Sequence, residues 1–291
     1  MTTANGHTWD PERYLAYADE RGRPFIDLIT RIGAPAAQSP APESPAPGPP
    51  APETVVDLGC GPGNLTRLLA ERWPAARVTG LDSSPEMIAK AHEADGPANL
   101  SFEVADLRDW VAPGNQLVAD PVDVLVSNAT LQWVPGHLEL LPAMLAKVRP
   151  GGWLAFQVPG NFDEPSHTIR AELAARPPYA EHVRGVDRPA SHDPEIYLDA
   201  LAGLGCTVDA WETTYLHVLQ GPDPVFTWVT GTGARPTLEA LGRVGLREEF
   251  EVEFRAALAA AYPPHEYGVV LPFRRIFVVA QVPEAGLGKA R

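Results

Sequence analysis

Short apolar runs alternate with segments of helical spacing between residues 54 and 159. The apolar runs are TVVDLG, RVTGLD, LSFEVAD, VDVLVSNA and GWLAFQVP. The helical segments include NLTRLLAERW, PEMIAKAHEA and HLELLPAMLAKV. Such alternation favours right-handed crossovers and a parallel sheet with helices on both faces. The runs lack regular polar alternation, as expected of strands that are buried on both faces. The pattern therefore predicts an α/β fold.

The C-terminal part of the chain has a different pattern. Residues 207–219 and 269–282 predict two long strands, and helical segments lie between them from about Pro224 to Tyr262. The simplest arrangement is a sheet that is closed by this final pair of strands and carries an inserted helical cap.

The stretch APAAQSPAPESPAPGPPAPE, residues 34–53, contains no large apolar residue. Because such a segment cannot contribute to a packed core, it predicts a flexible insert. We expect a single domain with a helical N-terminal lid at 1–33, this insert at 34–53, a ligand-binding core at 54–159, and the rest of the sheet with its helical cap at 160–291.

The chain is acidic, with a formal net charge of -14 and a pI near 5.0. This charge argues against nucleic acid as a partner, but a locally basic pocket would still accept a small anionic substrate. The polar N-terminus and the absence of a long apolar run predict a cytoplasmic protein with no membrane partner. Cys60 and Cys206 are too few for a metal cluster, so no metal is expected. The sequence does not determine the oligomeric state.

The stretch VVDLGCGPGN resembles a nucleotide-binding turn, with glycines at positions 59, 61 and 63. The dinucleotide fingerprint requires a glycine where Asn64 stands, which disfavours a nicotinamide or flavin cofactor. A phosphate-binding loop would require a Lys followed by Ser or Thr, which is also missing. Asp57 precedes the turn, and a carboxylate there suits a cofactor with positive charge rather than a pyrophosphate. S-adenosylmethionine, with its ammonium and sulfonium groups, has that charge.

Polar residues at the ends of the predicted strands support this cofactor. Gly59 and Gly61 can adopt positive φ and allow a ligand close to the backbone. Asp82 ends the second strand and can accept both ribose hydroxyls. Met87 can cover the adenine. Asp106 follows the third strand near the adenine amino group, and Asn128 follows the fourth near the methionine part.

The region from Val55 to Pro159 resembles class I S-adenosylmethionine-dependent methyltransferases, and further segments resemble the trans-aconitate methyltransferase family. These segments are WDPERYLAYADERGRP, SNATLQWVPGH, QVPGNFDEPSH, WETTYLHVL, WVTGTGARP and FRRIFVVA. The resemblance implies a Rossmann-like seven-stranded fold whose last strand is antiparallel. It also places Tyr14 over the cofactor. The predicted cofactor-binding residues are thus Tyr14, Asp57, Gly59, Gly61, Asp82, Ser83, Met87, Asp106, Leu107 and Asn128. The insert is the main departure, and on a surface connection it should leave the site intact.

The resemblance also implies the reaction: transfer of the methyl group to a carboxylate of trans-aconitate or a close small polycarboxylic acid, with S-adenosylhomocysteine as the second product. A carboxylate with a pKa near ~4 is ionised at neutral pH, so no general base is required. The enzyme must position the reacting atoms and exclude water.

Arginine is the best side chain to hold such a substrate, because its planar fork grips a carboxylate with two hydrogen bonds. The candidates Arg23, Arg235 and Arg275 lie in the family-like segments. Arg274 adjoins Arg275 on a strand, so only one of the two should point into the site. Polar and aromatic residues complete the predicted substrate pocket: Gln132, Trp133, His167, Tyr215 and His217.

Three alternatives remain open at this stage. The protein is a methyltransferase for another small acid or an amine, because the fold and cofactor do not determine the acceptor. It is a non-catalytic protein that binds S-adenosylmethionine. Or it is a nicotinamide-dependent oxidoreductase, although Asp57 and Asn64 speak against that.

Overall fold

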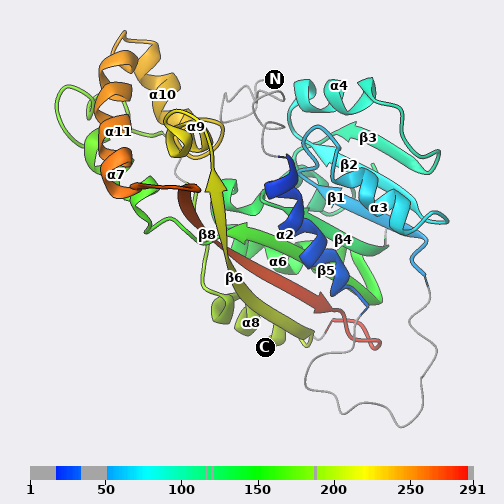
Figure 1. Cartoon of the computed structure of the whole chain (residues 1–291). Helices are drawn as coiled ribbons and strands as arrows, with labels where there is room; N and C mark the ends of the chain where they lie inside the picture. Colours follow the sequence, from blue (N-terminus) through cyan, green and yellow to red (C-terminus); the bar gives the residue numbers. More distant parts are fainter. Residues whose placement is uncertain (1–17, 34–50, 116, 119–120, 187–188, 288–291) are drawn as a thin grey trace.

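The computed structural model describes residues 18–33, 51–115, 117–118, 121–186 and 189–287 (Figure 1). Its sheet has the strand order β3-β2-β1-β4-β5-β8-β6, and a short strand β7 pairs only with β8. The strands are β1 Thr54–Leu58, β2 Arg77–Asp82, β3 Leu100–Val104, β4 Val122–Asn128, β5 Val148–Pro159, β6 Thr207–Leu219, β7 Pro264–His265 and β8 Gly268–Gln281.

Strands β1 to β5 pair in parallel, and β8 lies antiparallel between β5 and β6. The predicted α/β class, the seven-strand path and the antiparallel last strand are therefore confirmed. The two-residue strand β7 was not predicted.

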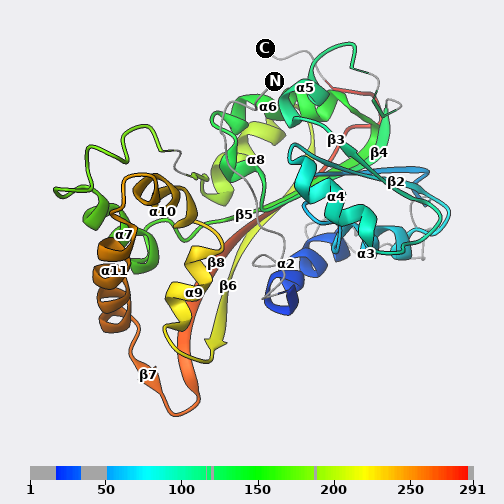
Figure 2. The ribbon, with the colours of Figure 1, turned by 90° about the horizontal axis from the view of Figure 1, so that it is seen from above.

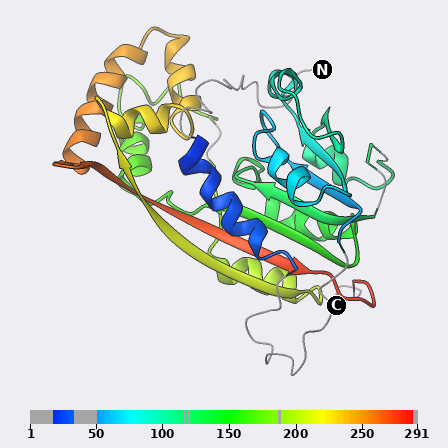
Figure 3. The same cartoon turned by 45° about the vertical axis from the view of Figure 1, so that its right-hand side comes forward.

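Helices pack on both faces of the sheet because alternate strand residues join different cores. Val55 and Val124 belong to a buried cluster with α2 (Ala18–Thr30) and α3 (Thr66–Arg72). Val56 and Leu125 belong to another, with α5 (Leu107–Val111), α6 (His137–Ala146) and α8 (Pro194–Ala202). Figure 3 shows α2 lying across the first face. The described part of the predicted N-terminal lid thus packs on the sheet, and closure over the cofactor stays a prediction, as does the division into regions.

The cap is built on the far ends of the two long strands. Its helices are α7 Pro165–Ala174, α9 Pro224–Thr230, α10 Arg235–Gly242 and α11 Arg247–Ala261. Trp228, Tyr179 and Phe250 are among its largest buried residues, and Leu219, Leu271 and Phe273 of β6 and β8 share the same core. Figure 2 shows the ribbon of β6 and β8 running from the main sheet into the cap. The predicted helical cap is confirmed.

Capping residues place polar groups at the ends of the parallel strands. Ser84 caps α4 (Pro85–Glu93) by accepting a hydrogen bond from the Met87 backbone N–H over 3.2 Å. Asp106 caps α5 in the same way, with 2.8 Å to the Arg108 N–H. Both caps lie at the carboxyl edge of the sheet, where ligands of open α/β sheets bind.

No helix in the described ranges combines the length and apolar character needed to cross a membrane.

Candidate active site

The turn after β1 is packed on one side and open on the other. Gly59 and Gly61 have φ of +74° and +56°, and the backbone N–H of Gly59 donates to the Leu81 carbonyl over 2.7 Å. A Cβ at Gly59 would lie 2.0 Å from Thr130 Oγ1, whereas a Cβ at Gly61 would meet no atom within 4 Å. Only glycine fits at the packed position, and the open side lets a ligand approach the backbone.

Asp82 holds this turn against the end of β2. Its Oδ2 accepts a hydrogen bond from the Gly61 N–H over 2.8 Å, and its Oδ1 accepts one from the Ser84 N–H over 2.9 Å. Burial raises the pKa of Asp82, and these two hydrogen bonds oppose that rise. Each carboxylate oxygen can accept more than one hydrogen bond, so the side chain retains capacity for ligand hydroxyls. Ser83 is exposed beside it.

Asp57 lies beneath the turn, 2% exposed. Its Oδ2 accepts a hydrogen bond from Thr66 Oγ1 over 2.7 Å, and its Oδ1 has no hydrogen-bond partner among the described residues. Its pKa is raised to about 7, mainly because the group is buried; the Thr66 hydrogen bond opposes this rise and the charge of Asp82 adds to it. A cationic ligand nearby would favour the ionised carboxylate. The pair of acids therefore fits a cofactor with positive charge.

The other predicted cofactor residues are spread along the same edge. Asp106 caps α5, and Asn128 ends β4. Met87 and Leu107 are 3% and 8% exposed. Tyr14 lies outside the described residues. The positions after β1, β2, β3 and β4 thus suit one elongated ligand.

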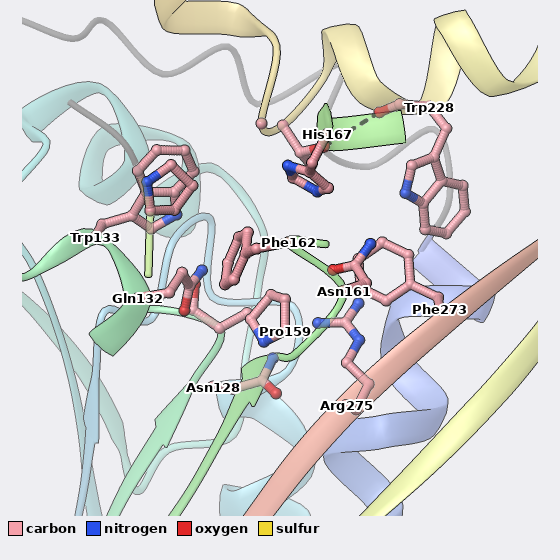
Figure 4. A pocket seen from close by; sticks show the side chains of 14 residues that line it. Asn128, Gln132, Trp133, Pro159, Asn161, Phe162, His167, Trp228, Phe273 and Arg275 are labelled. Carbon is pink, nitrogen blue, oxygen red and sulfur yellow. Dashed lines mark hydrogen bonds between the residues drawn. The ribbon is translucent and has the colours of Figure 1, made fainter. Parts of the chain in front are cut away.

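A cavity lies next to Asn128, between the sheet edge and the cap (Figure 4). Thr130 joins it to the glycine turn, because its Oγ1 lies 3.2 Å from the carbonyl oxygens of both Gly59 and Asn128. The sheet and its connections contribute Asn128, Gln132, Trp133, Pro159, Asn161, Phe162, Phe273 and Arg275 to the lining, and the cap contributes His167, Trp228, Thr232 and Gly233.

Gln132, Trp133, His167 and Arg275 of the predicted substrate residues line this cavity. Arg275 is 5% exposed, its guanidinium lies 4.3 Å from the Phe273 ring centroid, and its Nη1 donates to Gln157 Oε1 over 3.4 Å. Arg274 instead pairs with Asp193 over 2.8 Å and with Glu212. Of these two neighbours on β8, only Arg275 lines the cavity, and its role in substrate binding stays a prediction.

Arg23, Tyr215, His217 and Arg235 are not among the lining residues of this cavity. The Arg23 guanidinium lies over the Tyr215 ring at 5.1 Å, and the Tyr215 hydroxyl donates to Asp27 over 2.6 Å. Arg235 forms an ion pair of 2.7 Å with Glu239, one helical turn further on.

His217 is close to the cavity without lining it, since it stacks on Trp228 with 4.7 Å between ring centroids. His217 therefore contacts a residue that lines the cavity but is not itself a lining residue.

His167 is neutral at physiological pH. Burial and, to a smaller extent, the positive charge of Arg170 together lower its pKa to about 4. The imidazole therefore offers the cavity hydrogen bonds rather than charge.

Asn161, which was not among the predicted site residues, also lines the cavity. It is 2% exposed, and its Oδ1 has no hydrogen-bond partner among the described residues. Figure 4 shows the Arg275 guanidinium pointing toward it. A buried amide oxygen without a partner is costly unless a ligand satisfies it. Its position two residues beyond β5, within a family-like segment, was the available signal.

Comparisons with known proteins identify the family. Residues 17–193 match a model described as a methyltransferase domain. The trans-aconitate 2-methyltransferase of Streptomyces avermitilis is 52% identical over 279 residues, which are 94% of this chain and 96% of that protein. That of Streptomyces coelicolor is 49% identical, over 97% of this chain and 89% of that protein.

Solved structures support the fold alone. The [4+2]-cyclase SpnF matches with a TM-score of 0.50 and 14% identity, over 97% of this chain and 87% of that one. The YcgJ protein of Bacillus subtilis matches with a TM-score of 0.50 and 11% identity, over 80% and 93%. A cyclase among these neighbours shows that the fold does not determine the chemistry.

The sequence matches decide between the alternatives. A methyltransferase domain with a glycine turn backed by acids takes its methyl group from S-adenosylmethionine, so the predicted cofactor is confirmed. The oxidoreductase and the non-catalytic alternatives are thereby set aside. The chain belongs to the family of the trans-aconitate 2-methyltransferases.

Proposed function

We propose that this protein transfers a methyl group from S-adenosylmethionine to a carboxylate of trans-aconitate, or of a close small polycarboxylic acid, and so forms a monomethyl ester. The observation that carries the proposal is the buried Arg275 in a cavity that adjoins Asn128 and the glycine turn. The name of the relatives at 52% and 49% identity supports trans-aconitate as the acceptor.

Several residues along the carboxyl edge of the sheet support the binding of this cofactor. The open side of Gly61 exposes backbone for a close approach, and Asp82 offers acceptors for the ribose hydroxyls. The negative charge of Asp57 beneath the turn favours a positively charged methionine part. Asn128, shared by the turn side and the cavity, would lie where the cofactor meets the acceptor.

Arg275 is suited to hold a carboxylate. Its guanidinium is planar, permanently charged and fixed by the aromatic ring of Phe273 and by Gln157. A charge-assisted hydrogen bond in such a buried place is stronger than one in water. Arg23 and Arg235 stay predictions for the other carboxylates. Arg235 follows Gly233, which lines the cavity, by two residues.

The proposed reaction needs little acid or base chemistry from the protein. S-adenosylmethionine supplies an electrophilic methyl group on its sulfonium. A carboxylate is ionised at neutral pH, so its oxygen attacks without losing a proton. His167 is neutral and lies in the lining, which suits a hydrogen-bonding role. The chain therefore acts by holding and orienting its ligands.

The lining of the cavity also serves to exclude water. Trp133, Phe162, Trp228 and Phe273 supply large aromatic surfaces from both the sheet side and the cap side. A dry site strengthens the attraction between Arg275 and a carboxylate and keeps water from competing as a hydrogen-bond partner. Because the cap completes the wall, we expect it to influence which acids are accepted.

The net negative charge of the chain and the cavity also support a small-molecule partner rather than nucleic acid, and we expect the protein to work in the cytoplasm.

The test is methyl transfer from isotopically labelled S-adenosylmethionine to trans-aconitate, with cis-aconitate, citrate, isocitrate and succinate run in parallel and the ester identified by mass spectrometry. We expect trans-aconitate to react with the highest kcat/KM. A faster reaction with another acid would make that acid the substrate. No ester from any acid, with S-adenosylhomocysteine bound, would refute the proposal and favour an amine acceptor.

A further inference from the structure

Gln157 connects the two halves of the proposed site. It lies on β5 with 1% of its surface exposed. Its Nε2 donates a hydrogen bond to Asn128 Oδ1 over 2.7 Å, and its Oε1 accepts one from Arg275 Nη1 over 3.4 Å. One side chain thus contacts both the residue shared with the cofactor side and the arginine of the cavity.

The register of three central strands brings these groups together. Gln157 is the direct partner of Asn128 between β4 and β5, and Arg275 is the partner of Pro159 between β5 and β8. All three side chains are buried, so water cannot replace the hydrogen bonds between them. A buried polar network of this kind has a fixed geometry when its members are satisfied.

An amide is the side chain that suits this position. Asn128 presents an oxygen and requires a donor, whereas Arg275 presents N–H groups and requires an acceptor. Glutamine supplies both from one rigid plane. A glutamate would present oxygens to both sides, and an apolar residue would satisfy neither.

The hydrogen bonds also determine what Asn128 and Arg275 offer to ligands. Because Asn128 Oδ1 is used by Gln157, its NH₂ group points away from Gln157. Because Gln157 holds Arg275 by Nη1, the guanidinium cannot turn without losing that bond. Both residues line the cavity that adjoins the glycine turn.

We propose that Gln157 is a positioning residue, which fixes Arg275 relative to Asn128 and thereby the acceptor carboxylate relative to the methyl donor. This inference rests on the proposed function. Small errors in the placement of reacting groups reduce rate far more than affinity, since a shift of about 1 Å can cost ~100-fold. Loss of Gln157 should therefore reduce kcat and leave ligand binding nearly intact.

The test compares Gln157→Met, which removes both hydrogen bonds at similar size, with Gln157→Glu. For Gln157→Met we expect kcat with trans-aconitate to fall roughly 10- to 100-fold, with KM within about 3-fold of wild type. For Gln157→Glu we expect KM to rise by at least about 10-fold, because the new carboxylate would form an ion pair with Arg275 and compete with the substrate carboxylate. Calorimetry of S-adenosylhomocysteine, and of trans-aconitate alone, measures binding without turnover.

Gln281→Met is the matched control. Gln281 lies at the other end of the sheet on β8 and donates from Nε2 to the Gly151 carbonyl over 3.2 Å. We expect its kinetics to match wild type. A Gln157→Met protein with wild-type kcat would overturn the inference. A loss of thermal stability together with a loss of affinity for both ligands would also overturn it, because that result indicates a merely structural role. An inactive wild type would overturn the proposed function and this inference together, whereas an active wild type confines any failure to Gln157.

Discussion

The backbone N–H of Gly61 lies 2.8 Å from Asp82 Oδ2 and donates a hydrogen bond to it. This contact spans 21 residues of sequence and holds the turn after β1 against the end of β2. The other oxygen of Asp82 accepts the Ser84 N–H at the start of α4. One carboxylate therefore shapes the turn at the edge of the sheet where we expect the cofactor to bind.

Replacing this carboxylate should weaken cofactor binding. In Asp82→Asn an NH₂ group would face one of the two backbone N–H donors, and an acceptor for the ribose would be lost. Hydrogen bonds to charged groups contribute about 1.5 to 3 kcal/mol, so the dissociation constant of S-adenosylhomocysteine should rise roughly 10- to 100-fold. Isothermal titration calorimetry measures it.

Asp123→Asn is the control for that variant. Asp123 Oδ2 also accepts two backbone N–H groups, those of Glu53 and Thr54, but at the opposite end of the sheet. Its loss should lower thermal stability and leave S-adenosylhomocysteine affinity unchanged. Wild-type affinity in Asp82→Asn would contradict the assigned role.

A methyl group at Gly59 should disrupt the turn. Its Cβ would lie 2.0 Å from Thr130 Oγ1, at a φ of +74°. Gly114 has a φ of +84°, with no atom within 4 Å of an added Cβ. Each Ala variant carries the same backbone strain of about 1 to 2 kcal/mol, and only Gly59→Ala adds a clash. We expect Gly59→Ala to lose at least about 10-fold in S-adenosylhomocysteine affinity, since a shift of 1.4 kcal/mol is tenfold. Equal affinities in the two variants would show that Thr130 moves aside.

The two neighbouring arginines of β8 should differ in their effects on catalysis. Arg275→Ala removes a buried cation from the cavity, and breaking a buried charge pair costs about 3 to 5 kcal/mol. The KM for trans-aconitate should therefore rise by at least about 100-fold. Arg274→Ala breaks the ion pairs with Asp193 and Glu212, which contribute at most about 1 kcal/mol at a surface. Its KM should stay near wild type, and steady-state kinetics of both variants tests the assignment.

The pH dependence of stability should reveal the buried state of His167. Its folded pKa of about 4 lies below the ordinary value of 6.5, so between these values the unfolded chain binds more protons. Stability contributed by neutral His167 is thus present above pH 6.5 and is lost as the pH falls toward 4, by about 3 kcal/mol in total.

Asp57 contributes a pH dependence of the opposite sign between pH 4 and 6.5. Its folded pKa of about 7 lies above the ordinary value of 3.8, so its contribution lowers stability as the pH rises. The difference between wild type and His167→Gln isolates the histidine. Urea unfolding at pH 5.0 and 7.5 should show a smaller fall in the variant. An equal fall in the free energy of unfolding between pH 7.5 and 5.0 in the two proteins would contradict a buried neutral His167.

Local patterns predicted the fold and the location of the proposed cofactor residues at one edge of the sheet. Strand and helix periodicity is visible in short windows, and Asp82, Asp106 and Asn128 follow their strands directly, so topology alone brings them to one edge. The alternation of side chains along β8 also predicted that Arg274 and Arg275 would point apart. These predictions required no knowledge of which distant segments meet.

Only four of the eight predicted substrate residues line the cavity, because its lining depends on packing between distant segments. Arg235 has Glu239 four residues further along its helix, so a local partner competes with the site. No local pattern indicated that His217 would stack on Trp228, a residue that lines the cavity. No helical or strand periodicity predicts that Asn161 is buried, because its burial arises where the cap meets β5 and β8.

Asn161 should select for a negatively charged acceptor. Its amide is buried beside Arg275, and half a turn about its last side-chain bond would direct the NH₂ group toward a carboxylate. Asn161→Asp keeps the shape but places a second carboxylate next to the substrate. At about 4 Å two like charges repel by about 4 kcal/mol near a protein surface, so KM for trans-aconitate should rise by at least about 100-fold. The KM for succinate, which carries fewer charges, should rise less.

Asn115→Asp, a surface change in the loop after α5, should leave both KM values unchanged. A proportional rise for both acids in Asn161→Asp would show that its amide supports the wall of the cavity instead of binding the acceptor.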